Sequence, residues 1–550
     1  MSRSFNTTGI CVPEMDYMAD ISGRVAAAKA MVNQGLYFAI SRPRQFGKST
    51  LIAGLERELS KDMHCASISF EWSDDESFGD SEKFCSSFIG KVYEALDLKA
   101  LGSEALDSEA IGSEALGSDW LKEDLKTFDD LDQQITKLCK NRKVALIIDE
   151  ADCAYRYKPF FDFISLLRDK LLQRERGAGA TFQSVMLVGL HDLKTFAPQS
   201  SWSIAAPFQV DMSLSQAEIL GMLECYESDH STGMDAAKIS ELIFDYTAGY
   251  PFLVSNICKL MAERIGWSLE GVLEAVKRIV KDSPLCTLLD DVAKFVLSND
   301  PIRDLIYEIL FEGKEKPFAN SDPNIQRAEA LGLIRAYPKI ISEAPEKSGV
   351  EAFARIFPAP FRNFGICTKE KNGCCAVSNR IFEIFISRLM ASRFSNASDK
   401  SVFGSPGSAI DESGRFSMEL CLAGFAEDFG TVFTSDDAKY LEDNGRMVFV
   451  LYLLGMTSGT GFFQIESRFT DEEKMGVIVD SGPKQYVIEV RSCHGKRDRE
   501  KAYEQLRGHL DKKEVQEGYL LTLNLSNEKD CSPEAEWVRY KDVRIYDVVV

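Results

Sequence analysis

The sequence is poor in histidine and in patterned cysteine, which argues against a structural zinc site. Its 550 residues include five histidines and 14 cysteines, and no two cysteines have the Cys-x-x-Cys spacing. The adjacent pair Cys374-Cys375 is poorly suited to hold a metal ion. We therefore expect reduced and mostly buried thiols, as in a cytoplasmic protein.

Positive charge is also scarce, and long apolar runs are absent. Lys and Arg number 64 against 85 Asp and Glu, which gives a formal net charge of −21. This balance argues against a protein that coats nucleic acid through its overall charge, although it is compatible with a local basic patch. No run of eighteen apolar residues occurs, and the first ten residues lack the apolar stretch of a signal peptide. The sequence therefore predicts a cytoplasmic protein without membrane contact.

The composition is otherwise that of a globular protein, with 45% hydrophobic and 27% charged residues. At roughly 150 residues per domain, the length predicts three to four domains. Short apolar runs in the first 212 residues alternate with segments of helical spacing. The runs predict strands at residues 36–40, 64–70, 144–148, 185–190 and 208–212. Strands that alternate with helices predict an α/β fold with a parallel sheet.

Helical segments follow this predicted sheet. Their spacing predicts a small helical lid at residues 215–227, 235–247 and 252–265, so we place the first domain at residues 1–270. Between the second and third strands, a Ser-Glu-Ala unit recurs with a five-residue period, which fits neither a heptad nor a solenoid. We interpret residues 97–120 as an acidic surface insertion without chemistry.

Two further domains are predicted beyond the lid. Residues 290–394 combine helical segments with two short apolar strands, which favours a winged-helix-like domain or, equally, a packing module that binds nothing. Residues 395–415 are rich in Ser, Gly, Asp and Asn, and they are the best linker candidate. Residues 416–550 predict a separate α/β domain, whose last strand we expect at residues 518–525.

A candidate nucleotide site begins directly after the first predicted strand. Residues 42–50 follow the phosphate-loop pattern Gly-x4-Gly-Lys-[Ser/Thr], except that Arg42 takes the place of the first glycine. Gly47 lets backbone N–H groups approach a phosphate closely. Lys48 would reach the β- and γ-phosphates, and Ser49 would hold Mg²⁺. The residues expected to bind the nucleotide from this loop are Arg42, Arg44, Gln45, Phe46, Gly47, Lys48, Ser49 and Thr50.

Two acids about a hundred residues further on strengthen this interpretation. Asp149 and Glu150 directly follow the apolar run 144–148, at the carboxyl end of a predicted strand. Asp149 would bind in the Mg²⁺ shell of the nucleotide, and Glu150 would polarise the attacking water as general base. Taken alone, two such acids are also typical of a solvated turn or a helix N-cap. Together with the loop, they predict a site for ATP and Mg²⁺.

Two other places are weaker candidates. His191 and Asp192 follow the fourth predicted strand, where a polar residue can sense the γ-phosphate, although a capped turn explains them equally well. Residues 249–251, Gly-Tyr-Pro, open the last lid helix and would either abut the nucleotide or serve as a plain turn.

These segments carry a specific resemblance. They resemble the bacterial AAA-ATPase-like proteins, a family that also carries Arg in place of the first loop glycine, and residues 206–226 are similar to it as well. The resemblance covers most of the chain except the insertion. It implies an ATP-binding domain followed by a restriction-endonuclease-like α/β domain of the PD-(D/E)XK nuclease superfamily. The matching N-terminal segments are Phe5-Asn6-Thr7-Thr8-Gly9, Pro13-Glu14, Tyr17-Met18 and Arg42-Pro43-Arg44-Gln45-Phe46-Gly47-Lys48-Ser49.

The nuclease-like site implied by this resemblance departs from the family's pattern at two positions. The superfamily uses Asp…Glu-x-Lys, in which the two acids hold Mg²⁺ and the Lys helps to place water. Here Glu489 matches, but Gly476 replaces the Asp and Arg491 replaces the Lys. Glycine offers no ligand, and a guanidinium stays protonated. Glu442 and Gln505 match the family's helix positions, yet we expect the site to be degenerate and inactive.

Binding by this C-terminal domain is still compatible with the sequence. Residues 484–513 carry more basic than acidic side chains, which fits contact with nucleic acid or a protein partner but also a solvated helix face. Our main expectation is a Mg²⁺-dependent ATPase that acts as a conformational switch, coupled to an inactive nuclease-like binding domain. The alternatives are an ATP-gated DNA nuclease and a non-enzymatic interaction protein with a structural nucleotide. Each is compatible with an oligomer.

Overall fold

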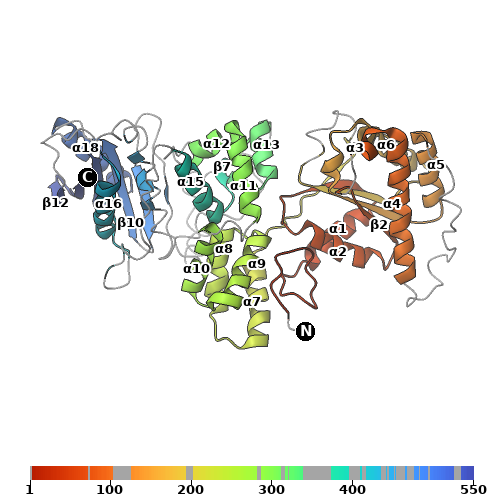
Figure 1. Cartoon of the computed structure of the whole chain (residues 1–550), viewed down its shortest axis with the longest axis horizontal. Coiled ribbons are helices and arrows are strands. Elements are labelled where there is room, and N and C mark those ends of the chain that lie inside the picture. The colour runs from red at the N-terminus through yellow and green to blue at the C-terminus, as the bar shows by residue number, and fades with distance from the viewer. Residues whose placement is uncertain are drawn as a thin grey trace, which may run out of the picture. The chain divides into compact units, whose positions relative to one another are not determined.

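A computed structural model of the chain shows two compact units (Figure 1). The first comprises Met1–Ser231, Gly249–Lys259 and Ala330–Gly332, and the second comprises Thr232–Ala248, Leu260–Glu329 and Leu333–Val550. The structure describes residues 3–71, 75–102, 126–191, 193, 202–281, 287–310, 316–319, 321–337, 373–394, 409, 411, 416–434, 441, 445–446, 448–450, 452–453, 465–466, 476–481, 484–492, 496–513, 515–524 and 534–550. Most of the acidic insertion and of the predicted linker lies outside these residues.

A five-stranded sheet of order β2-β3-β4-β1-β5 forms the centre of the first unit, and all its described strand pairs are parallel. The parallel sheet expected from the sequence is therefore present. Its strands are β1 (Tyr37–Ser41), β2 (His64–Ser69), β3 (Val144–Asp149), β4 (Ser184–Gly189) and β5 (Ala206–Pro207). Strand β4 separates β1 from β3, so the ends of these three strands are neighbours at one edge of the sheet.

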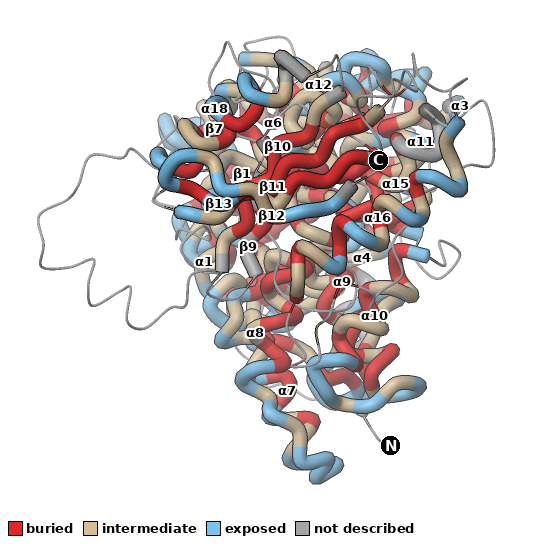
Figure 2. Tube along the Cα trace, turned by 90° about the vertical axis from the view of Figure 1, so that its left-hand side faces the viewer, coloured by how far each residue is buried: buried red, intermediate tan, exposed pale blue. Residues whose placement is uncertain are grey.

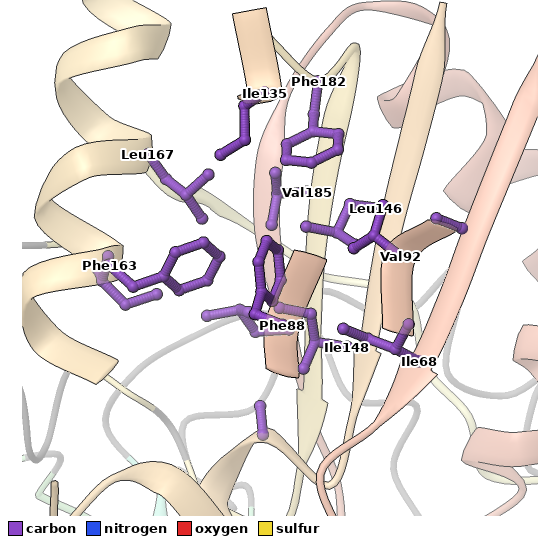
Figure 3. Packing of buried hydrophobic residues seen from close by; sticks show 14 of the residues in the cluster. Ile68, Phe88, Val92, Ile135, Leu146, Ile148, Phe163, Leu167, Phe182 and Val185 are labelled. Atoms are coloured by element: carbon purple, nitrogen blue, oxygen red, sulfur yellow. The ribbon is translucent and has the colours of Figure 1, made fainter. Parts of the chain in front are cut away.

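Alternating side chains of the strands build a core on each face of this sheet. Phe38 and Ile40 of β1 join a cluster with α1 (Ser22–Asn33) and α2 (Lys48–Leu59). Tyr37 of β1 belongs to the cluster of the opposite face, under α4 (Ser81–Gly102), α5 (Phe128–Cys139) and α6 (Lys158–Glu175). Figure 3 shows Phe88, Phe163 and Leu167 of that cluster directed toward Leu146 and Ile148 of β3.

The fifth strand differs from the expectation at residues 208–212. The structure confines β5 to Ala206–Pro207, which pair with Phe38 and Ala39 of β1. Phe208 lies beyond the strand and stacks its ring on that of Phe38, with centroids 5.8 Å apart. The apolar residues there are explained by this packing and not by a strand.

The three helices expected as a lid are present as α7 (Gln216–His230), α8 (Ala236–Thr247) and α9 (Pro251–Leu260), and α9 continues into the π turn Met261–Ile265. A capping box starts α7, because the Ser215 side chain accepts from the backbone N–H of Glu218 and the Glu218 carboxylate accepts from that of Ser215. Helix α7 belongs to the first unit and α8 to the second.

The second unit contains the helices and the strand pair that predicted a winged-helix-like domain. Strands β6 (Ile334–Tyr337) and β7 (Cys374–Val377) pair antiparallel. The helices are α10 (Leu269–Lys281), α11 (Thr287–Ser298), α12 (Asp300–Leu310), α13 (Pro323–Ala330) and α15 (Arg380–Phe394).

An ion pair joins α15 to α8 within this unit. The guanidinium of Arg380 donates to the carboxylate of Asp245, and it lies 4.5 Å from the centroid of the Tyr246 ring. Burial raises the pKa of Glu383, one turn further along α15, to about 7, while Arg380 and Arg335 act to lower it. A carboxyl group that ionises near neutral pH therefore lies beside this ion pair.

A six-stranded mixed sheet of order β12-β13-β11-β10-β9-β8 organises the C-terminal part. Its central strands β10, β11 and β13 run parallel, and β9 and β12 run antiparallel to their neighbours. Helix α16 (Met418–Val432) packs on one face and α18 (Lys496–Lys513) on the other. Figure 2 shows β10 and β11 buried along most of their length. The strands are β8 (Ile465–Glu466), β9 (Gly476–Ser481), β10 (Lys484–Ser492), β11 (Glu517–Leu523), β12 (Glu534–Tyr540) and β13 (Val543–Val549).

The expectation that the strand at 518–525 is the last was wrong. Strands β12 and β13 follow β11 as a hairpin, and Lys541 in its turn has a φ of 52°. The sequence of β12, Glu-Ala-Glu-Trp-Val-Arg-Tyr, contains no continuous apolar run, so a search for buried runs passes over it. Within the described part of the chain, no helix is long and apolar enough to cross a membrane.

Candidate nucleotide site

The predicted phosphate loop lies between β1 and the start of α2. Two of its residues have left-handed backbone conformations, Gln45 with a φ of 56° and Gly47 with a φ of 82°. A Cβ atom added to Gly47 would meet no atom within 4 Å, so glycine is favoured there by its backbone conformation and not by crowding. The loop turns directly into the first turn of α2, whose backbone N–H groups favour an anion.

Lys48 is buried at the start of α2, with 8% of its surface exposed. Its Nζ donates to the carbonyl oxygens of Arg42 and Pro43, at 3.0 and 2.9 Å. Burial lowers the pKa of Lys48, and the charges of Glu150 and Asp149 oppose this effect. The amine therefore contacts the backbone of the loop and is acted on by the charges of Asp149 and Glu150, the two acids that the sequence predicted for the same site.

Arg42, at the position of the missing glycine, anchors the loop through its side chain. Its guanidinium donates to the carbonyl oxygens of Ser41 and Val210, both at 2.8 Å, and lies 5.9 Å from the centroid of the Phe208 ring. The backbone N–H of Arg42 donates to the carbonyl of Gly189 at 3.1 Å. These contacts tie the beginning of the loop to the segment after β5 and to the end of β4.

The turn at 249–251 also contacts this loop. The Tyr250 hydroxyl donates to the carbonyl of Arg44 at 2.6 Å, and its ring meets that of Phe46 edge-on, with centroids 4.7 Å apart. Gly249 has a φ of 74°, and a Cβ there would lie 1.9 Å from the carbonyl oxygen of Leu214, so only glycine fits. The turn, which leads directly into α9, thus supports the loop. Contact of the turn with a nucleotide stays a prediction.

The remaining loop residues are more accessible. Arg44, Gln45 and Ser49 are exposed, so their side chains are open to a ligand. The Thr50 hydroxyl accepts from the backbone N–H of Cys11 at 3.2 Å, which brings the N-terminal segment to α2.

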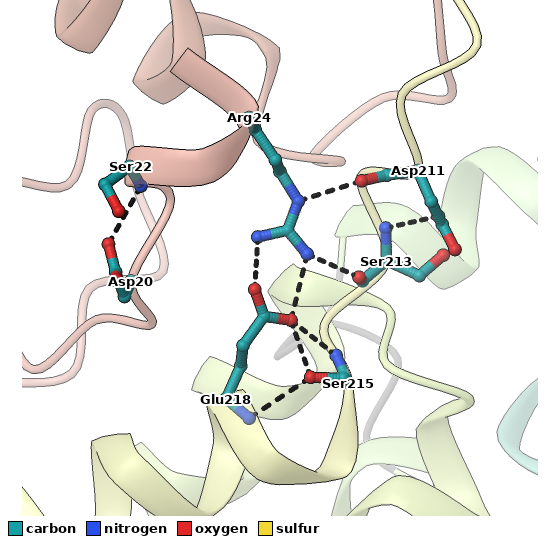
Figure 4. Close-up of polar contacts among 7 residues, drawn as sticks. All are labelled: Asp20, Ser22, Arg24, Asp211, Ser213, Ser215 and Glu218. Atoms are coloured by element: carbon teal, nitrogen blue, oxygen red, sulfur yellow. Dashed lines mark hydrogen bonds and ion pairs between the residues drawn. The ribbon is translucent and has the colours of Figure 1, made fainter. Parts of the chain in front are cut away.

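An ion pair joins helices α1 and α7 of the same unit. Figure 4 shows Arg24 of α1 bound to both oxygens of Glu218, at 2.6 and 2.9 Å, and to the carbonyl groups of Asp211 and Ser213. Because Glu218 also completes the capping box of α7, one guanidinium joins α1 to the start of α7.

The two predicted acids lie at the carboxyl end of β3, as expected. Burial raises the pKa of both Asp149 and Glu150, and Lys48 acts against it in each case. Asp149 Oδ1 accepts from the backbone N–H of Glu150 at 2.9 Å. Glu150 itself has a φ of 51°, a conformation that costs a non-glycine residue free energy and is often found at functional sites.

A third acid, Asp152, was missed by the sequence interpretation. Its charge acts on Lys48, Asp149 and Glu150, so it belongs to the same cluster. The sequence signal for Asp152 was Asp-Glu-Ala-Asp at 149–152. A 3₁₀ turn after β3 brings Asp152, the last of these four residues, back to the strand ends. Of the proposed sensors, His191 accepts through its carbonyl from the Ser41 hydroxyl at 3.2 Å, and Asp192 lies outside the described residues.

A comparison with protein families decides the identity of this unit. The family described as "AAA-like domain" matches residues 15–335, more than half of the chain, and the match includes the loop, the three acids and the lid helices. The chain belongs to the AAA-like domain family.

Several solved structures are similar to this AAA-like protein at low identity. The Aeropyrum pernix ORC1 protein in complex with DNA is 10% identical, with 68% of this chain and 94% of that chain covered at a TM-score of 0.30. The ORC2 protein of the same organism in its ADP form is 14% identical, with 61% and 90% covered at 0.30. The Thermotoga maritima RuvB Holliday junction branch migration motor is 13% identical, with 58% and 89% covered at 0.30. TM-scores this low carry no argument about function, and comparison with curated proteins gives no match.

The C-terminal part of the AAA-like protein places the predicted nuclease-like residues as follows. Glu489 of β10 is directly opposite Gly476 of β9, and the residue is 4% exposed. Its Oε2 lies 3.3 Å from Nδ1 of His509 on α18, a residue that the sequence interpretation did not select. Gln505 is exposed one turn earlier on α18. Glu442 lies outside the described residues.

Two arginines of α18 have acidic partners. The Nε of Arg499 donates to the fully buried carboxylate of Asp547 at 2.7 Å. The Nε of Arg507 donates to Asp542 at 2.6 Å, and its guanidinium also pairs with Glu504 and Asp511. These ion pairs reduce the positive charge that the helix offers to an anionic partner.

Proposed function

We propose that this AAA-like protein binds ATP with Mg²⁺ at the loop after β1 and hydrolyses it slowly, as a conformational switch. The observation that carries the proposal is the convergence of Lys48 with Asp149 and Glu150, which act on one another electrostatically although a hundred residues separate them. A structural role alone does not require a buried amine and two half-buried carboxylates at the same edge of a sheet.

Each residue has a role that follows from its position. Backbone N–H groups of the loop and of α2 would bind the phosphates. Lys48 would leave the carbonyls of Arg42 and Pro43 and turn to the β- and γ-phosphates, since a phosphate oxygen is a stronger partner for an amine. Glu150, whose pKa is raised by burial, would accept a proton from the attacking water.

The residues present fit a magnesium ion. Mg²⁺ takes one or two carboxylates together with phosphate oxygens and several waters. Asp149 and Ser49 lie at the strand end and the helix start that would supply these ligands, and Asp152 contributes a solvent-shielded oxygen that lacks a hydrogen-bond partner. When bound, the ion would neutralise charge that develops on the phosphates. Among the described residues, no group of three or more His, Cys, Asp or Glu side chains is arranged to hold a metal by itself, which suits an ion that arrives with the nucleotide.

We further propose that the C-terminal domain is a degenerate nuclease-like domain that binds and does not cut. The register supports this proposal, because the residue facing Glu489 is Gly476, which has no side chain. The exposed face of α18 is its candidate contact for nucleic acid or a protein partner.

The test is a set of measurements on the purified full-length chain. Calorimetry with ATP, with and without Mg²⁺, measures binding, and phosphate release with and without DNA measures turnover. A cleavage assay on single- and double-stranded DNA in Mg²⁺ and Mn²⁺ runs beside them. Binding that requires Mg²⁺, together with slow phosphate release and no cleavage, is the expected result. Absence of ATP binding in every condition would refute the proposal.

A further inference from the structure

Asp152 has no defined contact in the function proposed above, and its environment is unusual. It lies in the 3₁₀ turn Ala151–Ala154, directly after Glu150. Its Oδ1 is shielded from solvent and has no hydrogen-bond partner. A shielded carboxylate oxygen without a donor costs free energy, so such atoms normally have a partner in the functional state.

The end of β4 leaves room for this oxygen. A Cβ atom added to Gly189 would lie 2.4 Å from Asp152 Oδ1 and 3.1 Å from its Cγ. Any other residue at 189 would therefore displace the carboxylate. Since the carbonyl of Gly189 also accepts from the backbone N–H of Arg42, Asp152 lies beside the strand end that holds the beginning of the loop.

The neighbouring groups do not supply the missing donor. Lys48 acts on Asp152 electrostatically, but its Nζ donates to the carbonyls of Arg42 and Pro43. Asp149 and Glu150 are carboxylates and, when ionised, only accept hydrogen bonds. Among the described residues none donates to this oxygen, so a water or a ligand would supply the donor.

The chemistry of a magnesium nucleotide restricts what that donor is. Phosphate oxygens only accept hydrogen bonds, and the negative charge of the Asp152 carboxylate would repel them. Waters bound to Mg²⁺ are strong donors, because the ion withdraws charge from them, and Mg²⁺ retains several of them. Asp152 lies with the three residues assigned to the phosphate end of the nucleotide, which is where these waters are found.

We propose that Asp152 is a positioning residue that accepts a hydrogen bond from a water of the nucleotide's Mg²⁺ shell. This inference rests on the proposed ATP site and extends it by a third carboxylate that acts through water. It assigns Gly189 a role as well, because the absence of a side chain there lets Asp152 reach the water.

The test compares nucleotide affinity with and without Mg²⁺ by calorimetry, a readout that needs no turnover. In the full-length Asp152→Asn variant we expect ATP affinity in Mg²⁺ to fall roughly 10-fold, because a neutral amide oxygen is a weaker acceptor than a carboxylate. Affinity in EDTA should be unchanged. The matched control is Asp62→Asn, which removes a carboxylate of the same unit that pairs with Lys29 and should leave both affinities unchanged.

A second variant keeps the inference falsifiable if Asp152→Asn folds poorly. Gly189→Ala should reproduce the loss in Mg²⁺, and it should add nothing further in an Asp152→Ala background, because the two changes remove the same contact. Equal Mg²⁺ dependence in Asp152→Asn and wild type would overturn the inference and leave the ATP site standing. Failure of wild type to bind ATP would refute the ATP site, and with it the inference.

Discussion

Lys48 combines a positive charge with almost no exposed surface, and it has exchangeable partners. Its present acceptors are two neutral carbonyl oxygens of its own loop, so a phosphate can replace them without breaking any contact elsewhere. This arrangement leads us to expect that Lys48 contributes much to ligand binding and little to folding.

We predict that Lys48→Ala weakens ATP binding by about 10- to 100-fold, since hydrogen bonds to charged groups are worth about 1.5–3 kcal/mol. Calorimetry on a variant with a normal circular dichroism spectrum measures the effect. Lys61→Ala, which removes an exposed lysine paired with Glu58, is the control and should bind like wild type. ATP binding that is unchanged in Lys48→Ala would contradict the assignment.

Glu150 is assigned as the general base, and its replacement separates chemistry from binding. Glu150→Gln keeps the size of the side chain and its ability to form hydrogen bonds. It should bind ATP normally and release phosphate at least ~100-fold more slowly, the lower end of general-base effects. Glu175→Gln, an exposed acid on α6, serves as the control. Hydrolysis at the wild-type rate in Glu150→Gln would show that another group activates the water.

At the scale of elements, the pairing of β9 with β10 decides whether the C-terminal sheet can hold a metal. Residues directly opposite each other in an antiparallel pair have Cβ atoms about 5 Å apart. An acid at 476 would therefore adjoin Glu489, whereas the glycine leaves one carboxylate, which binds Mg²⁺ weakly.

We predict that the wild-type protein does not cut single- or double-stranded DNA in Mg²⁺ or Mn²⁺. The paired variant Gly476→Asp with Arg491→Lys introduces the Asp and Lys of the nuclease pattern that the sequence resembles, and it is expected to gain metal-dependent cleavage above the wild-type background. A gel-based cleavage assay measures both proteins. Cleavage by wild type that disappears in Glu489→Ala would show that the degenerate interpretation is wrong.

The contact of Tyr250, the residue before α9, with the phosphate loop gives a prediction about the loop's support. Tyr250→Phe keeps the edge-on ring contact with Phe46 and removes only the hydroxyl that donates to Arg44. The free energy of unfolding should fall by about 1 kcal/mol, the usual net value of one hydrogen bond. Urea unfolding measures it, and ATP should still stabilise the variant. A loss of stabilisation by ATP would mean that the hydroxyl contacts the nucleotide itself.

Elements with continuous apolar runs were predictable from the sequence, and elements without them were not. Strands β1, β3 and β4 are largely buried on both faces, so each is a run that stands out from its surroundings, whereas β2 shows an alternating pattern. Strand β12 has one exposed face and charged residues, and β5 has only two residues. Neither β12, at the edge of its sheet, nor β5 therefore contains a continuous apolar run that a sequence search would find.

Side-chain direction was the part of the site that sequence spacing could not give. The spacing placed Arg42 in the loop, but the direction of its guanidinium toward Val210 depends on a segment 168 residues away. Likewise, the surroundings of Asp152 and His509 depend on the turn after β3 and on the helix over β10, although the sequence Asp-Glu-Ala-Asp already pointed to Asp152. The motif residues themselves, Lys48, Asp149 and Glu150, were predictable because their roles depend on strand and helix ends.

At the scale of the whole molecule, one carboxyl group links stability to pH. Burial raises the pKa of Glu383 to about 7 from an ordinary value of 4.5, with Arg380 and Arg335 opposing and Asp245 adding to the shift. Because the folded state holds this proton more tightly, its contribution to stability is fully present below pH 4.5 and is lost as the pH rises through 7.

We therefore predict that Glu383→Gln melts like wild type near pH 4.5 and at a higher temperature than wild type at pH 8. The glutamine stays neutral, so it avoids the cost of a buried charge. Thermal unfolding of both proteins across this pH range measures the difference. Glu270→Gln, an exposed acid on α10, should follow wild type throughout. Parallel curves for Glu383→Gln and wild type would contradict the prediction.

The division of the chain into interleaved units has a consequence for its synthesis. Residues 249–259 and 330–332 belong to the first unit, and residues 232–248 and 260–329 of the second unit, respectively, precede these two segments. A ribosome therefore finishes the loop and its acids long before it adds Tyr250 and Gly249, so the nascent site has no support from α9 until about 260 residues have emerged. A fragment that ends at residue 231 would retain Lys48, Asp149 and Glu150 and yet lack this support. Expression of that fragment would yield a phosphate loop without the contacts that Tyr250 makes in the full-length chain.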